Sequence, residues 1–167
     1  MSGPRTVVLE LTRMEAAHLA GLVSQFAELL DGARSTSGDP AIARLVPDAY
    51  ADDAAAAQDF RDVTEQDLLE RRREDAGRVL ASLHDATLLP DAPEPAGDAA
   101  LELIELRLDP EELRSWLRSL AAIRLVLATR LGIRTEDDHD VDDPRFGIYD
   151  WLGYRLDGLV QAASEDD

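Results

Sequence analysis

The chain of 167 residues contains no cysteine. Disulfide bonds, thiolate-bound metals and thiol-based catalysis or redox sensing are therefore excluded for this chain. Lysine is also absent, so all 17 basic residues are arginines. Because arginine keeps its charge when buried and can bind a carboxylate through two hydrogen bonds, ion pairs inside the protein form readily.

Long apolar segments are missing as well. The longest are far shorter than the roughly 20 residues that cross a bilayer, and residues 1–8 lack the apolar centre of a signal peptide. We therefore expect a cytoplasmic protein without a membrane partner. The net charge of -18 repels phosphate, which argues against direct binding to DNA or RNA and favours a basic protein partner.

One stretch, residues 109–132, carries the signals of a central helix. Asp109 is suited to cap the first free amides, Pro110 to the first helical position, and Gly132 to a left-handed exit. Ser115 is predicted to lie away from the apolar side of this helix. That side is formed at helical spacing by Leu113, Trp116, Leu117, Leu120, Ile123, Leu127 and Leu131.

The remaining elements follow from shorter patterns. Segments 6–11 and 101–108 favour strands, which could pair into a small ribbon. Thr12 and Glu15 form a capping box that starts a helix ending near Leu30. Further helical segments are predicted over residues 40–45, 52–62, 146–163 and, after a fresh cap at Thr64, up to residue 89.

We predict a single domain over residues 1–167, a mainly α helical bundle around the central helix with a minor two-stranded β element. A proline-rich linker at 90–97 and an acidic loop at 135–144 interrupt the helices. Gly153 and Gly158 weaken the last helix in isolation, which indicates close packing against the central helix.

Arg124 interrupts the apolar side of the central helix. A charge in that position must find a carboxylate or draw water inward. Asp150, beside Trp151 in the last helix, is the preferred partner, with Asp52 or Asp53 next. If Arg124 faces an open groove instead, it could bind a carboxylate of a partner protein or ligand.

Other polar clusters favour structural interpretations. Asp52 and Asp53 near Tyr50 could supply carboxylates for acid–base work, but helix capping is the stronger interpretation. The acidic loop lacks the glycine and the closing glutamate of a calcium-binding loop, so a solvated loop is favoured over a metal site. The run 71–73 of arginines and Asp75 are predicted to lie on an exposed, ion-paired helix face. We therefore expect no catalytic residue, metal or cofactor.

Three blocks carry a family resemblance. They are residues 44–68, with RLVPDAYADD and DFRDVTEQDL, residues 116–133, WLRSLAAIRLVLATRLGI, and residues 149–160, YDWLGYRLDGLV. The chain thereby resembles an actinobacterial family of formerly unknown function, usually encoded beside the Clp protease adaptor ClpS and now named after the oxidative-stress transcriptional regulator AosR. The resemblance implies a regulator that works with an alternative sigma factor. It brings no catalytic set, and the cysteines of its redox-sensing version are missing here.

The sequence thus predicts a non-enzymatic regulatory protein that acts by protein contact on a sigma factor or RNA polymerase, without a cysteine switch. The alternative is an accessory protein of the ClpS and Clp ATPase system, and a carboxylate-based enzyme is less favoured. The sequence leaves a homodimer open. Candidates for structural or partner-binding roles are Tyr50, Asp52, Asp53, Trp116, Arg124, Asp150 and Trp151.

Overall fold

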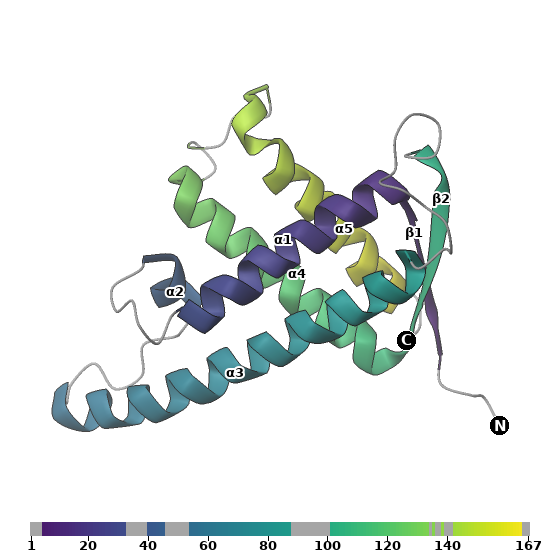
Figure 1. The fold of residues 1–167 in the computed structure, drawn as a ribbon. Helices are drawn as coiled ribbons and strands as arrows, with labels where there is room; N and C mark the ends of the chain where they lie inside the picture. The colour runs from purple at the N-terminus through teal and green to yellow at the C-terminus, as the bar shows by residue number, and fades with distance from the viewer. Residues whose placement is uncertain are drawn as a thin grey trace.

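A computed structural model describes residues 5–32, 40–45, 54–87, 101–133, 135, 138 and 142–164. The elements follow in the order β1 (Val7–Thr12), α1 (Arg13–Gly32), α2 (Pro40–Leu45), α3 (Ala54–Thr87), β2 (Leu103–Leu108), α4 (Pro110–Leu131), the 3-10 turn η3 (Pro144–Phe146) and α5 (Gly147–Ser164). The fold is mainly helical with one two-stranded sheet, which confirms the predicted fold class (Figure 1). None of the helices within these ranges is long and apolar enough to cross a membrane.

The two strands pair antiparallel at one side of the helices. Leu9 lies opposite Leu106, and Leu11 lies opposite Ile104. Because successive side chains of a strand point to opposite faces, these residues share one face, and Leu11 and Leu106 are buried in the core. The sheet therefore packs one face on the helices and exposes the other, as the alternating sequence predicts.

Helix α4 begins and ends where the sequence predicts. The Asp109 carboxylate accepts a hydrogen bond from the Glu112 amide at 2.8 Å, and the Glu112 carboxylate accepts one from the Asp109 amide at 3.0 Å. Gly132 ends the helix at φ 75°, in the left-handed region. Within the described residues α4 contacts the four other helices, α1 least, and its Trp116 is fully buried. It is therefore the central helix of the bundle (Figure 1).

Helix α3 is one continuous helix. The helical segments predicted over residues 52–62 and 65–89 are confirmed where the structure describes them, but the break predicted between them is wrong. No glycine or proline occurs between Ala54 and Ala76. A capping interaction such as the one predicted at Thr64 contributes only about 1 kcal/mol. This does not outweigh continued helical hydrogen bonding where nothing in the main chain forces a break.

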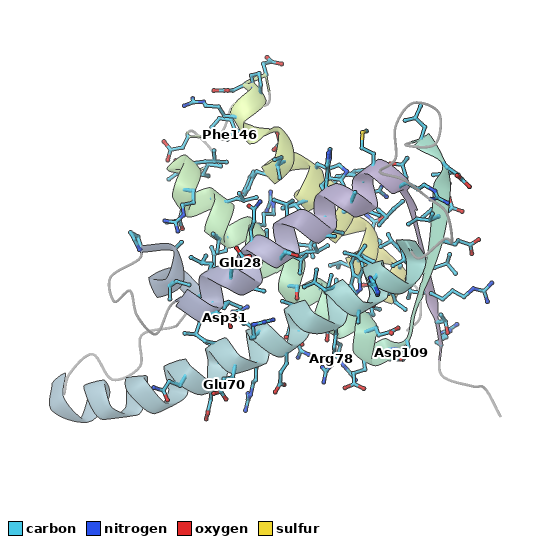
Figure 2. All side chains as sticks on the ribbon, in the orientation of Figure 1. Glu28, Asp31, Glu70, Arg78, Asp109 and Phe146 are labelled. Atoms are coloured by element: carbon cyan, nitrogen blue, oxygen red, sulfur yellow. The ribbon has the colours of Figure 1, made fainter. Side chains whose placement is uncertain are left out.

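The contact between α3 and α4 contains a buried charge, where the sequence analysis predicted an exposed face. Asp75 is 5% exposed and accepts a hydrogen bond from the Ser115 hydroxyl at 3.0 Å. Arg118 lies 3.0 Å from its second oxygen, and Arg78, labelled in Figure 2, donates to the Ser115 hydroxyl at 3.3 Å. Ser115 is fully buried, contrary to prediction. Apolar periodicity misses both residues because each is buried only as the partner of the other.

Replacing Asp75 with alanine is expected to lower the free energy of unfolding by about 2 kcal/mol, because the buried Ser115 hydroxyl and Arg118 lose their acceptor. Arg118 is 56% exposed, so solvent limits its share of the loss. Chemical denaturation at neutral pH measures the difference. The matched control is Asp31→Ala, which removes an exposed carboxylate that lies 2.9 Å from Arg73 and should cost less than about 0.5 kcal/mol. Equal losses in the two variants would contradict the prediction.

Candidate functional site

A polar cluster joins the start of α1 to the middle of α5, and we call Thr12, Glu15, Trp151 and Arg155 the Glu15 hub. The predicted capping box is present: the Glu15 amide donates to the Thr12 hydroxyl at 3.1 Å, and the Thr12 amide donates to Glu15 Oε1 at 3.3 Å. Glu15 Oε2 accepts a hydrogen bond from the Trp151 indole at 3.0 Å and pairs with the Arg155 guanidinium. A single carboxylate therefore starts α1 and attaches α5 to it.

The environment of Glu15 favours its charged form. Burial alone would raise the pKa of Glu15, but hydrogen bonds from Arg155, the Thr12 amide and Trp151, together with the positive charge of Arg155, outweigh it and hold this pKa below its ordinary value. The side chains of Glu15 and Arg155 are only 22% and 23% exposed. The hub is therefore a partly dehydrated ion pair at neutral pH, in which charge-assisted hydrogen bonds fix the orientation of α5.

The α1–α5 groove, of about 520 Å³, borders the hub between the two helices. Leu22, Ile148 and Trp151 supply apolar lining, and Glu15 and His18 are among the polar residues in it. The lining includes two glycines, Gly21 and Gly147. A Cβ added at either position would meet no described atom within 4 Å, apart from its chain neighbours and the main chain of its own helix. The groove can accept apolar side chains of a ligand or partner next to a rigidly held indole ring.

The β1–α5 groove, of about 690 Å³, borders the same hub on Arg155. One wall consists of four successive strand residues, 7–10, and the other of α5 residues at helical spacing, Tyr154, Asp157, Gly158 and Gln161. Arg155 donates a hydrogen bond to the Glu10 carbonyl at 3.3 Å. Main-chain atoms of β1 therefore take part in a side-chain contact across this groove.

Arg124 contacts Tyr149, the residue before its predicted partner. The guanidinium carbon lies 4.0 Å from the centroid of the Tyr149 ring, and Nε donates to the Tyr149 carbonyl at 3.4 Å. A Cβ at Gly153 would lie 3.0 Å from two nitrogens of Arg124, so the predicted close packing of Gly153 against the central helix is confirmed. The ion pair between Arg124 and Asp150 stays a prediction.

The other predicted residues separate into three groups. Trp116 lies fully in the core and Trp151 in the Glu15 hub. Gly158 does not pack closely on α4, contrary to prediction, because a Cβ there would have only open space around it among the described residues. Outside the described residues lie Tyr50, Asp52, Asp53, the linker at 90–97 and half of the acidic loop at 135–144. Within the described part of the chain, no group of side chains suited to hold a metal occurs.

The sequence predicts a role for Trp151 but not for the residues that hold it. In the sequence Glu15 is only half of a capping box, and no local pattern distinguishes Arg155. The two are 140 residues apart, and no spacing rule connects positions that only the tertiary fold brings together. The capping box is the one local signal that points to this site, because it places the Glu15 side chain at the start of α1.

A family model described as "Domain of unknown function (DUF2017)" matches residues 1–163, and the chain belongs to this family. No curated protein and no solved structure matches the chain significantly. The matched region contains the Glu15 hub and the residues that line both grooves.

Replacing Glu15 with glutamine is expected to lower the free energy of unfolding at pH 7 by about 1 to 2 kcal/mol, because Arg155 loses its ion pair. The pKa of Glu15 is depressed by folding, so its charge stabilises the protein above its ordinary pKa of 4.5, and this contribution disappears as the pH falls through the folded value. Denaturation at pH 7 and at about pH 3.5 should show the gap between wild type and variant shrinking in acid.

The matched control for this prediction is Glu28→Gln, which removes an exposed carboxylate from the same helix (Figure 2). Its loss should stay within about 0.5 kcal/mol at both pH values, as for other exposed positions. A gap between wild type and Glu15→Gln that widened on acidification would refute the assignment of a depressed pKa to Glu15.

Proposed function

We propose that this member of the DUF2017 family is a non-enzymatic regulatory protein that binds other proteins along α5. The observation that supports this most directly is the distribution of exposed apolar side chains. Seven large ones are exposed among the described residues, and three of them line one of the two grooves: Val8, Ile148 and Tyr154. Apolar surface left open beside grooves is typical of protein interaction sites.

We infer that the partner belongs to the transcription apparatus, as a sigma factor or RNA polymerase. The resemblance to the AosR regulators supports this inference, since two of the resembling blocks, 116–133 and 149–160, contribute to α4 and α5. The net charge of -18 favours a basic partner and speeds its approach. Such a regulator would act in the cytoplasm and, without cysteine, would need a signal other than thiol oxidation.

The α1–α5 groove is the part of this surface best suited to anchor such a partner. Ile148 is 52% exposed beside Trp151, and Glu15 holds the Trp151 indole in one orientation. A few residues contribute most of the binding energy in protein interfaces, and tryptophan is enriched among them. We therefore place the first contact with the partner at Ile148 and Trp151.

Ile148→Asp is expected to weaken binding to a purified sigma factor or RNA polymerase by at least about tenfold, because it places a charge in the apolar contact. The matched control is Val160→Asp, which changes an equally exposed residue of α5 that is not in the lining of either groove. Its binding should stay within about twofold of wild type. Titration calorimetry measures both, after thermal unfolding has shown that the variants are folded.

The same titrations with ClpS and a Clp ATPase test the alternative function. Binding to either of these, and none to sigma factor or polymerase, would replace the transcriptional proposal with an adaptor role. Equal weakening by Ile148→Asp and Val160→Asp would refute the assignment of the contact to the α1–α5 groove.

A further inference from the structure

The outer edge of β1 is open for strand pairing. β1 has one strand neighbour, β2, in the sheet that the described residues form. In an antiparallel pair, successive residues alternate between bonding to the partner strand and pointing away from it. The Arg13 amide donates to the Glu102 carbonyl at 3.0 Å and so continues the β1–β2 ladder. The main-chain groups of Val8, Glu10 and Thr12 therefore point away from β2.

The Glu15 hub occupies one end of this edge. The Thr12 amide donates to Glu15, and the Glu10 carbonyl accepts from Arg155. Both hydrogen bonds lie on the side of β1 that faces away from β2, as the register predicts. Among the described residues, the Val8 amide, the Val8 carbonyl and the Glu10 amide have no partner. Three main-chain groups thus remain for an incoming strand, and the hub sets the end of the segment that can pair.

A helix faces this open edge across the β1–α5 groove. Tyr154, 72% exposed, offers a ring to an occupant, and Gly158 leaves space where a side chain would begin. The four lining residues of β1 span about 13 Å at about 3.3 Å per residue, enough for a short extended peptide. A cleft between a free strand edge and a helix is a recurrent arrangement for binding peptides by strand addition.

The charges of the groove select the occupant. Glu10 on the strand and Asp157 on the helix line opposite walls, whereas Arg155 is paired with Glu15. Glu105 lies directly opposite Glu10 in the sheet, on the face where Arg107 lies opposite Val8. Like charges directly opposite each other destabilise a strand pair, so a further cation close to Glu10 relieves this repulsion. Since the whole chain carries a charge of -18, a basic segment is attracted and an acidic one repelled.

We propose that the β1–α5 groove binds an extended segment of a partner protein in which apolar and basic side chains alternate, and that this segment adds to β1 as a third strand. Its main chain pairs with Val8 and Glu10, its apolar side chains contact Tyr154, and its basic side chains lie near Glu10 and Asp157. This surface is distinct from the α1–α5 groove and does not depend on the partner proposed there.

The test uses the full chain and a capped eight-residue peptide of alternating valine and lysine, with fluorescence anisotropy as the readout. Val8→Pro removes the outward amide without interrupting the β1–β2 ladder, since proline is tolerated where the amide faces solvent. We expect it to weaken binding by at least about tenfold. The matched control Val8→Thr keeps the amide and the branched shape and should bind within about twofold of wild type.

Charge and location are tested with the same readout. A valine–glutamate peptide should bind at least about tenfold more weakly than the valine–lysine peptide, and Asp157→Asn should reduce both the affinity and its salt dependence. Ile148→Asp should leave peptide binding unchanged. If the peptide binds but sigma factor and polymerase do not, the proposal for the α1–α5 groove fails and the one for the β1–α5 groove stands. If sigma factor or polymerase binds but the peptide does not, the outcome is the opposite.

Peptide variants keep the test decisive if Val8→Pro does not fold. Two further peptides carry N-methyl groups on every second amide, one at the odd positions and the other at the even positions. One of them should not bind the wild-type protein and the other should bind normally, because only alternate amides of the peptide point toward β1. The proposal is overturned if the valine–lysine peptide does not bind, if both N-methylated peptides bind equally, or if the acidic peptide binds as tightly as the basic one.

Discussion

The position of α5 relative to α1 depends on the carboxylate of Glu15. Helix α5 packs mainly on α4, and it approaches α1 at few positions other than the hub. The Glu15 side chain closes the capping box of α1 and holds both Trp151 and Arg155. Because α1 and α5 are held together at this point, the grooves on either side of it have fixed walls. The position of one ion pair thus determines the shape of the surface that we assign to partner binding.

A second carboxylate, Asp75, has the corresponding role inside the bundle. It lies between α3 and α4, where Ser115 and Arg118 satisfy both of its oxygens. In a chain whose only strong cation is arginine, both of these carboxylates pair with a planar group that has several donors and a permanent charge. Removing water from such a pair costs free energy, and the hydrogen bonds from Ser115 and Arg118 that offset this cost require α3 and α4 to be aligned. Asp75 therefore contributes more to the alignment of α3 and α4 than its net energy suggests.

Local signals in the sequence predicted most of the fold. The capping residues Asp109 and Gly132, the two alternating strands and the apolar side of α4 all act through near neighbours in the chain, and the structure confirms them. The local signal at Thr64 predicts a break in α3 that is absent, because a capping residue alone does not interrupt a helix.

Contacts between distant residues were beyond this reasoning. The burial of Asp75, the pairing of Glu15 with Arg155 and the contact of Arg124 with Tyr149 each need a partner that only the folded chain brings near. Two features of the candidate site, Trp151 and the capping role of Glu15, can be predicted from the sequence. Neither groove can, because each is formed by segments far apart in the chain.

The position of β2 in the chain has a consequence for folding. Strand β1 pairs with a segment that follows α1, α2 and α3, so three of the described helices lie between the two strands in the chain. Closing so large a loop costs entropy before any strand hydrogen bond compensates for it, and such pairings form late. The chain can complete α1, α2 and α3 while β1 is still unpaired. An ordered β1 edge is therefore a property of the finished molecule, and any protein that recognises it would discriminate folded chains from those still being made.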